Sequence, residues 1–313
     1  MRLALKVDVD TLRGTREGVP TLVEMLRRHD LKATFLFSLG PDHTGRAIKR
    51  VFRPGFVGKV RRTSVVKHYG VRTLLYGTLL PGPDIGKRAR DVMQGVRDAG
   101  HETGIHCWDH VRWQDGVAHA DAQWTRREME RACERYVEVF RESPQTHGAA
   151  GWQMNVHALR LTQQLGFSYC SDGRGTHPHL PVWRAELIRC PQFPTTLPTL
   201  DELIGVDGIT EENVAAHLLA RTQQASDSGH VFTLHAELEG GRLLSVLEQL
   251  LIGWKAQGWE IGPTRTLYEA VEPLALPRCE NQLGPVAGRT GTLLLQGDEF
   301  LGDVDGAESG RGL

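Results

Sequence analysis

Two aspartates two positions apart end the first apolar stretch of the chain. Residues 3–9 alternate apolar side chains with others, which is the period of a β-strand, and Asp8 and Asp10 stand at the C-terminal end of this stretch. Side chains at i and i+2 point to the same face of a strand, so the two carboxylates converge. Two like charges held together are unfavourable unless a cation or a shared proton relieves them. The pair therefore indicates a metal site, and the alternative is a strand end that merges into a polar turn.

A second pair of ligand-type residues, His106 and His110, follows another short apolar stretch. If the chain turns helical after His106, the two imidazoles lie on one face and can hold one cation, whereas a purely structural histidine pair is the alternative. Together with Asp10 they form a His-His-Asp set with open coordination positions, and Asp8 is left beside it as a carboxylate that can act as a base. We therefore predict one bound divalent metal ion, with zinc, manganese and cobalt as candidates.

His235 ends a later apolar stretch, at residues 230–235, and can supply the acid that amide hydrolysis needs. A hydrogen-bonded core histidine is the alternative. Asp172, just after the stretch at 167–170, is a carboxylate able to orient His235. Arg174 can pair with a carboxylate or an anionic substrate, or it can face solvent in a turn.

A flexible turn with an aromatic residue follows another predicted strand. Gly151 and Trp152 lie in the segment 149–152, directly after the stretch at 146–149. Backbone amides in such a turn can stabilise an oxyanion. An ordinary strand-to-helix turn explains the same residues, and the sequence leaves both interpretations open.

Strands that alternate with helices must position these residues. The predicted strands are residues 3–9, 33–38, 101–106, 146–149, 167–170, 187–190, 230–235 and 259–261, and the predicted helices include 19–26, 89–99, 121–140, 154–165, 210–225 and 243–256. This alternation predicts parallel strands covered by helices. About seven or eight such units, without a Gly-x-Gly-x-x-Gly motif after the first strand, favour a β/α barrel over a doubly wound sheet. Barrel active sites lie at the C-terminal ends of the strands, where the candidate residues stand.

Composition limits the classes of function. The chain has 313 residues, 40% of them hydrophobic, which is ordinary for a soluble protein with a full core. A formal net charge of −1 argues against general nucleic-acid binding. Five cysteines without C-x-x-C spacing suit free thiols in a reducing compartment. Charges at Arg2 and Lys6 interrupt any apolar signal sequence, so we expect a cytoplasmic protein.

A basic block interrupts the barrel pattern after the second strand. Residues 46–72 carry nine Lys and Arg residues and no acidic residue, with apolar side chains at i+4 steps between them. Each positive charge that faces an anionic leaflet contributes up to about 1 kcal/mol. An insertion at 41–88 can therefore attach to an anionic membrane surface, while nucleic-acid binding and a merely solvated basic face are the alternatives. The arginines predicted to make this contact are Arg50, Arg53, Arg61 and Arg62.

The chain divides into a barrel and a tail. Residues 1–275 are predicted to form the barrel, with the insertion inside it. Residues 276–313 are rich in glycine and mostly polar, and we predict a mobile, peripheral tail.

The candidate residues occur in the order and pattern of a known family. Asp8-Val9-Asp10, His106-x-x-x-His110, Asp172 and Leu234-His235 together resemble the motifs of the polysaccharide deacetylase (NodB-homology) family. The resemblance implies an α/β fold, a distorted (β/α)7 barrel with the basic insertion after strand 2, and a divalent metal ion. It implies metal ligation by Asp10, His106 and His110, with Asp8 as general base and His235 as general acid.

One motif departs from the family pattern. The third motif of the family usually carries an arginine that orients the base, and residues 149–152 contain none. Arg174 is the candidate to take over that role.

Longer segments, at residues 8–20, 104–110, 149–152, 171–175 and 235–237, resemble deformylases within this family. That resemblance implies hydrolysis of 4-deoxy-4-formamido-L-arabinose linked to undecaprenyl phosphate, which yields formate and an aminosugar lipid for lipid A modification and polymyxin resistance. It also implies a peripheral location on the inner face of the bacterial inner membrane. The alternatives are a carbohydrate N-deacetylase of another substrate, a non-catalytic polyprenyl-phosphate-binding protein, and a non-haem iron oxygenase, whose ligands are also two histidines and a carboxylate.

Overall fold

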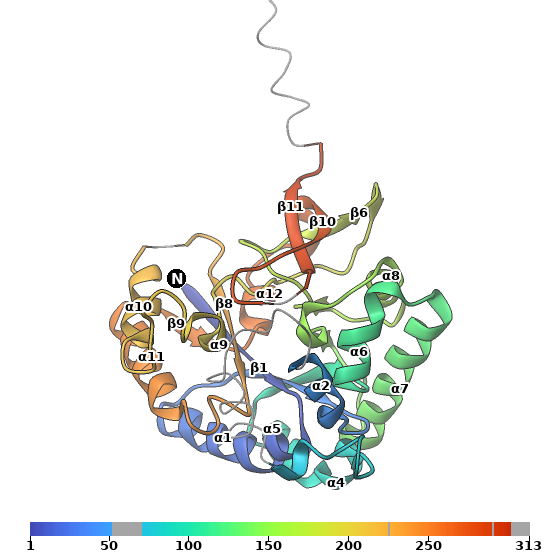
Figure 1. The fold of residues 1–313 in the computed structure, drawn as a ribbon. Coiled ribbons are helices and arrows are strands. Elements are labelled where there is room, and N and C mark those ends of the chain that lie inside the picture. The colour runs from blue at the N-terminus through green and yellow to red at the C-terminus, as the bar shows by residue number, and fades with distance from the viewer. Residues whose placement is uncertain (52–70, 225, 290, 302–313) are drawn as a thin grey trace, which may run out of the picture.

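The first strand, β1 (Arg2–Val9), runs through the middle of the computed structural model, which describes residues 1–51, 71–224, 226–289 and 291–301 (Figure 1). Every second side chain from Leu3 to Val9 is buried in the hydrophobic core, together with residues of α1 (Val19–Arg28). Burying each of these side chains stabilises the fold by about 1.5–3 kcal/mol. Because side chains alternate across a strand, Lys6 and Asp8 point to the opposite face.

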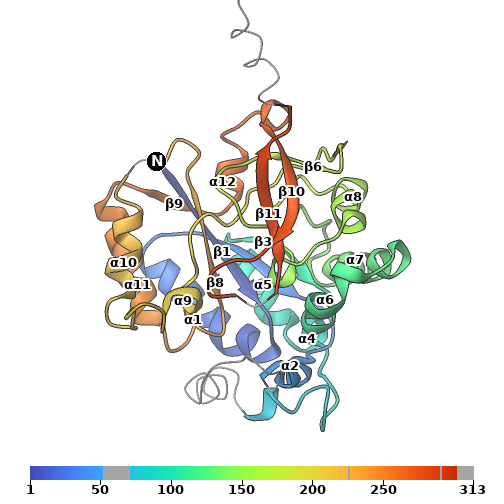
Figure 2. The same ribbon diagram turned by 45° about the horizontal axis from the view of Figure 1, so that its top comes forward.

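Seven parallel strands form one curled sheet, which confirms the predicted parallel α/β architecture (Figures 1 and 2). The order is β5-β4-β3-β2-β1-β8, and β9 also pairs with β1. In the described residues β5 does not pair with β8, so the barrel is an open half-barrel. The other strands of this sheet are β2 (Thr34–Ser38), β3 (Glu102–Cys107), β4 (Thr146–His147), β5 (Tyr169–Cys170), β8 (His230–His235) and β9 (Glu260–Gly262).

Helices lie around the outside of the curled sheet (Figure 1). The longest helix in the described residues is α7 (Ala122–Phe140). It begins after Asp121, whose side chain caps it by accepting a hydrogen bond from the Trp124 N–H at 2.7 Å. The other α-helices in the described part of the chain are α2 (Thr44–Val51), α4 (Ile85–Arg88), α5 (Arg90–Asp98), α6 (His110–Gly116), α8 (Val156–Gln164), α9 (Leu200–Leu203), α10 (Val214–Arg221), α11 (Leu244–Ala256) and α12 (Arg265–Tyr268). Shorter turns are the π-helix η1 (Gly14–Gly18) and the 3-10 helices η2 (Val117–His119), η3 (Ala150–Trp152) and η4 (Pro273–Ala275). The helix predicted at 210–225 is shorter than expected, and the others match their predicted positions closely.

The hydrogen-bond register aligns the strand ends that carry the candidate residues. Asp8 on β1 is the register partner of His235 on β8. Phe37 on β2 pairs with Val9 of β1 and with Ile105 of β3. The C-terminal ends of β8, β1, β2 and β3 therefore lie side by side, and their following residues meet at one end of the half-barrel.

Residues after 275 are part of the fold, so the prediction of a mobile peripheral tail is wrong for the described part of this segment. β10 (Arg278–Gly284) and β11 (Leu293–Glu299) pair antiparallel. They join β6 (Leu180–Trp183) and β7 (Glu186–Leu187) in a second, four-stranded sheet, and the hairpin is drawn in red in Figures 1 and 2.

The hairpin is fixed to the barrel by its backbone. The Arg174 N–H donates to the Leu294 carbonyl oxygen and the Gln296 N–H donates to the Arg174 carbonyl oxygen, both at 2.8 Å. Leu293 and Leu294 are buried. The glycines that suggested a mobile tail include Gly288 and Gly291, which lie between the two strands at positive φ, where glycine is favoured.

The predicted basic insertion is described only at its two ends. Arg50 lies in α2, and its side chain falls outside the described part of the chain, as do Arg53, Arg61 and Arg62 in full. Among the described residues, no helix is both long enough and apolar enough to cross a bilayer. The boundaries at 41–88 and at 275 stay predictions.

Candidate active site

Three side chains converge where β1 and β3 end. The Asp10 Oδ1 lies 3.2 Å from Nε2 of His106 and 3.4 Å from Nε2 of His110. One ligand atom from each residue lies within 4.8 Å of the others, and His110 is the least buried of the three. The structure therefore brings together the three residues predicted as metal ligands.

Neighbouring groups orient both imidazoles. His106 Nδ1 lies 2.7 Å from the carbonyl oxygen of Gly148, so Nδ1 carries the proton and the lone pair of Nε2 points toward Asp10. His110 is the first residue of α6, and the side chain of Asp109 caps that helix. The chain thus turns from strand to helix within the H-x-x-x-H motif, as its spacing predicts.

Glu237 holds the backbone that carries Asp10. Its Oε1 accepts hydrogen bonds from the Asp10 N–H at 3.1 Å, the Thr11 N–H at 2.9 Å and the Thr11 hydroxyl at 2.8 Å. A Cβ on Gly14 would lie 1.9 Å from this oxygen, so any larger residue there would displace the Glu237 carboxylate. Burial, with Asp10 nearby, raises the pKa of Glu237 to about 8. Sequence reasoning missed this role, and the available signal was a carboxylate two residues beyond His235.

The donor set fits a divalent cation. The Asp10 Oδ1 is buried and has no hydrogen-bond partner among the described residues. Burial opposes its ionisation, yet His110 and His106 hold the pKa of Asp10 well below its ordinary value. A carboxylate kept ionised beside two imidazole nitrogens, with further positions open, is typical of catalytic metal sites.

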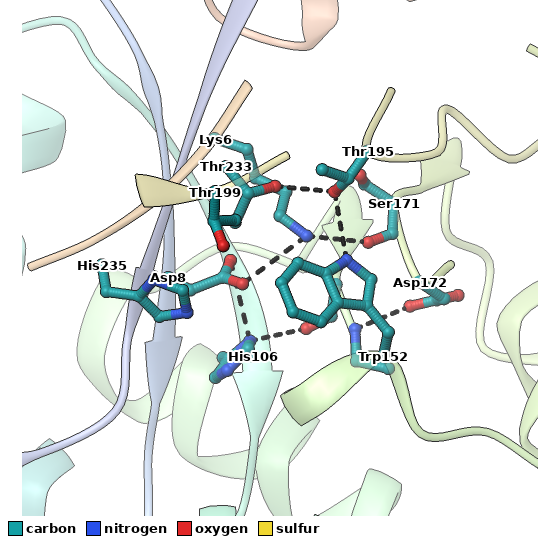
Figure 3. Close-up of polar contacts among 12 residues, drawn as sticks. Lys6, Asp8, His106, Trp152, Ser171, Asp172, Thr195, Thr199, Thr233 and His235 are labelled. Carbon is teal, nitrogen blue, oxygen red and sulfur yellow. Dashed lines mark hydrogen bonds and ion pairs between the residues drawn. The ribbon is translucent and has the colours of Figure 1, made fainter. Parts of the chain in front are cut away.

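Lys6 is the cation that contacts the predicted base. Its Nζ lies 3.6 Å from Oδ2 of Asp8, donates to the Ser171 carbonyl oxygen at 3.1 Å and lies 5.4 Å from the ring centre of Trp152 (Figure 3). Burial lowers the pKa of Lys6, whereas Asp8 opposes that shift. The side chain is fully buried, so the carboxylate and the ring replace the water that a surface lysine would have.

Arg174 does not contact the base, which corrects the prediction that it replaces the orienting arginine of the family. Its Nη1 donates to both oxygens of Glu202, at 2.8 and 3.1 Å, and its Nη2 donates to the Leu197 carbonyl oxygen at 3.2 Å. The contact with Asp8 comes from Lys6 instead. Lys6 stands two residues before Asp8 on the same strand, and side chains two residues apart share a face. This spacing was the sequence signal that Lys6 could contact Asp8.

His235 ends β8 close to Asp8, and an aromatic ring packs against it. The centres of the His235 and Trp152 rings are 6.4 Å apart, and their planes meet at 82° (Figure 3). The half-buried His235 has a buried Nδ1 without a hydrogen-bond partner among the described residues. Burial raises the pKa of Asp201, but Arg289 and then His235 lower it below the ordinary value, so Asp201 is a carboxylate within electrostatic reach of His235.

Asp172 contacts a different histidine from the one predicted. Its Oδ1 lies 2.6 Å from Nδ1 of His147 and accepts a hydrogen bond from the Ala149 N–H at 3.0 Å. These contacts correct the prediction that Asp172 orients His235. His147, Cys170 and Asp172 also offer ligand atoms within 4.8 Å of one another. Because the carboxylate already accepts these hydrogen bonds, we interpret this buried group as a support for the turn that begins at Ala149.

A backbone amide of the turn at 149–152 is already hydrogen-bonded within the turn. The Trp152 N–H donates to the Ala149 carbonyl oxygen at 2.9 Å, so it is not available to an oxyanion. Gly151 and Trp152 both have positive φ, 62° and 53°. Of the two interpretations that the sequence left open, the strand-to-helix turn describes this segment, which forms η3.

Comparison with known proteins assigns the family. Residues 3–170 match the polysaccharide deacetylase family. This chain belongs to that family. Its members include hydrolases, and the match covers Asp8, Asp10, His106 and His110.

Two bacterial relatives cover most of the chain. A protein of Shewanella sediminis (strain HAW-EB3), named a probable 4-deoxy-4-formamido-L-arabinose-phosphoundecaprenol deformylase, is 38% identical over 268 residues, which is 86% of each chain. A protein of the same name from Wigglesworthia glossinidia brevipalpis is 33% identical over 76% of this chain and 82% of its own. A solved structure described as a polysaccharide deacetylase from Mycobacterium smegmatis shares the fold, with a TM-score of 0.61 at 18% identity, over 88% of this chain and 92% of that one.

Replacing His106 or His110 by Ala should remove metal and activity together. Each substitution deletes one of the converging nitrogens, so the remaining donors hold a divalent ion weakly. Metal content after gel filtration, measured alongside turnover, tests this expectation. His119, a histidine on the 3-10 helix after α6, provides the matched control as His119→Ala and should leave the bound metal unchanged. Full occupancy in both site variants would remove the three residues from the metal site.

Replacing Lys6 by Met should lower kcat by up to about 100-fold while KM changes little, because Asp8 loses the cation that holds it in place. Lys6→Arg keeps the positive charge and should retain most of the activity. Metal content and the thermal unfolding midpoint, measured for both variants, separate this effect from loss of the fold. Equal kcat values for Lys6→Met and the parent protein would show that Asp8 does not depend on Lys6.

Proposed function

We propose that this protein hydrolyses the formyl amide of 4-deoxy-4-formamido-L-arabinose linked to undecaprenyl phosphate. The observation that carries the proposal is the placement of Asp8 and His235, register partners on adjacent strands, beside the group formed by Asp10, His106 and His110. That arrangement pairs one carboxylate and one imidazole with a candidate metal site. The names of the two bacterial relatives support the substrate.

A divalent ion held by Asp10, His106 and His110 would polarise the formyl oxygen and make water more acidic. Zinc, manganese and cobalt all suit two imidazoles and a carboxylate. The protein supplies the remaining chemistry through groups that move or hold protons.

Asp8 acts as the general base in this proposal. As water attacks the formyl carbon, one of its protons passes to the Asp8 carboxylate, which Lys6 keeps in place from 3.6 Å away. His106 Nδ1 lies 3.9 Å from Oδ1 of Asp8, so base and ligand are close neighbours.

His235 acts as the general acid. When the carbon–nitrogen bond breaks, the leaving nitrogen takes a proton from His235 and the carbon leaves as formic acid, which ionises to formate. The Asp201 carboxylate lies within electrostatic reach of this imidazole. The products are formate and the free aminosugar lipid, the amine that would serve lipid A modification and polymyxin resistance.

Asp8→Asn and His235→Ala should keep the metal and lose about 10²–10⁴-fold in the rate of formate release. Each variant removes one proton-transfer group without removing a ligand. The profile of kcat/KM against pH should lose its acidic limb in Asp8→Asn and its alkaline limb in His235→Ala. Turnover within a few-fold of the parent in either variant would assign that role to another residue.

The same assay tests the substrate. Purified, metal-loaded protein is given the formamido-arabinose lipid and, as the matched control, its acetamido analogue. Formate without acetate supports a deformylase. Acetate release at a comparable rate would favour a carbohydrate N-deacetylase, and no release of either, with tight lipid binding, would favour a non-catalytic binding protein.

We also propose that the basic block places the protein on the inner face of the inner membrane. The substrate carries a polyprenyl chain, and the nine Lys and Arg residues at 46–72 stand without an acidic neighbour in the sequence. Attraction between such a block and anionic lipid is screened within about 8–10 Å at physiological salt.

Reversing Arg50, Arg53, Arg61 and Arg62 to Glu should release the protein from anionic liposomes and leave its metal content unchanged. Co-sedimentation should rise with the anionic lipid fraction and fall with added salt for the parent protein. Turnover of a short-chain, water-soluble substrate should change little in the variant, while turnover of the polyprenyl substrate in vesicles should fall sharply. A variant that sediments as well as the parent would show that this block is not the anchor.

A further inference from the structure

The loop between β10 and β11 reaches the active site. Arg289 in this loop donates from Nη2 to the Thr199 hydroxyl and to Oδ1 of Asp201, both at 3.0 Å, and from Nε to Oε1 of Glu202 at 2.8 Å. Its guanidinium also lies 4.8 Å from the ring centre of Trp152. A residue of the C-terminal hairpin thus contacts the ring that packs against the predicted acid.

The Trp152 ring needs such support because its backbone is strained. Its φ of 53° follows a Gly151 φ of 62°, and a bulky residue rarely occupies this region. Strain of this kind persists only where the surroundings hold it, and it collects at functional sites. The ring is buried, its Nε1 donates to the Thr195 hydroxyl at 3.1 Å, and its edge-to-face contact with His235 fixes one side of the acid (Figure 3).

The charges around the ring favour a positioning role over anion binding. Arg174 and Arg289 each donate to Oε1 of Glu202 at 2.8 Å, and Arg289 also binds Asp201. Burial lowers the pKa of Arg174, Glu202 opposes that shift and Arg289 adds to it, so the two guanidinium groups are close neighbours. The two carboxylates neutralise the two arginines, so little net positive charge is left to bind a phosphate. Both guanidinium groups instead pack against the Trp152 ring.

We propose that Arg289 is a positioning residue that fixes the Trp152 ring, and through it His235, so that the β10–β11 hairpin completes the active site. The proposal rests on the proposed role of His235 as general acid. Arg289 touches no reacting atom and acts through the ring.

Close backbone packing supports this role for the hairpin. Gly288, directly before Arg289, has a φ of 82°, and a Cβ there would lie 2.8 Å from the carbonyl oxygen of Glu202. The loop therefore lies directly on α9, and only glycine permits that approach. Arg289 consequently enters the site from a fixed backbone rather than from a mobile tail.

The test compares Arg289→Ala, Arg289→Lys and Arg278→Ala. Arg278 stands in β10 with an exposed side chain, so Arg278→Ala is the control for disturbing the hairpin and should behave like the parent. Arg289→Ala should lower kcat for formate release by several-fold up to about 100-fold, with little change in KM or metal content. Arg289→Lys keeps the charge without the planar fork and should lie between them.

A double-mutant cycle decides whether Arg289 acts through the ring. Trp152→Leu removes the ring, and adding Arg289→Ala to it should lower kcat little further. Independent losses that multiply in the double variant would overturn the proposal, as would unchanged kcat in Arg289→Ala.

Acrylamide quenching supplies a readout that does not depend on turnover. The difference in fluorescence between the parent and Trp152→Leu reports Trp152 alone. The same difference, taken between Arg289→Ala and the double variant, should show a Trp152 signal that is more accessible to quencher. Unchanged quenching would show that Arg289 does not hold the ring. If the parent releases no formate, the proposed function fails, and the quenching comparison still decides the contact.

Discussion

Burying ionised side chains on the inner face of β1 is the constraint on which the rest of the site depends. The side chain of Lys6 is fully buried and that of Asp8 is 3% exposed, on a strand whose other face belongs to the apolar core. Breaking a buried ion pair by removing one partner typically destabilises a protein by about 3–5 kcal/mol. Neighbouring groups compensate for the burial of both charges. The Ser171 carbonyl oxygen and the Trp152 ring contact Lys6, and the imidazole of His106 lies beside Asp8. The buried charges of the site therefore contribute to the stability of the fold as well as to its chemistry.

Local periodicity was enough to predict much of the site. The period of two placed Asp8 and Asp10 together, and the i+4 spacing placed His106 and His110 on one turn, because both patterns depend only on the geometry of a strand or helix. The parallel sheet followed from the alternation of strands and helices. Lys6 obeys the same period, so its position on the face of Asp8 was readable. The role of Lys6 could not be predicted in the same way. Lysine is rarely buried, and the resemblance to the family pointed to an arginine as the partner of the base.

Contacts between distant parts of the chain were not predictable from these patterns. Glu237 binds the backbone of Asp10 across 227 positions, and Lys6 binds Ser171 across 165. The partner of Asp172 was misjudged for the same reason: several histidines end neighbouring strands, and only the packed sheet shows that His147 is the one within reach. The hairpin after residue 275 was read as a tail because its pairing with β6 lies outside any local pattern. Glycine there marks a turn against α9 rather than mobility.

The Trp152 ring lies between the surroundings of the predicted base and the predicted acid. A tryptophan at positive φ is unfavourable by about 1–3 kcal/mol. Three cationic groups lie against its ring, Lys6 at 5.4 Å, Arg174 at 5.0 Å and Arg289 at 4.8 Å, and each such contact contributes about 0.5–2 kcal/mol. Together they are large enough to offset the strain. One of these cations also contacts the predicted base, and the same ring packs edge-to-face with the predicted acid. Strain of this kind persists only where the surroundings hold it, and here the same ring contacts both Lys6, the partner of Asp8, and His235.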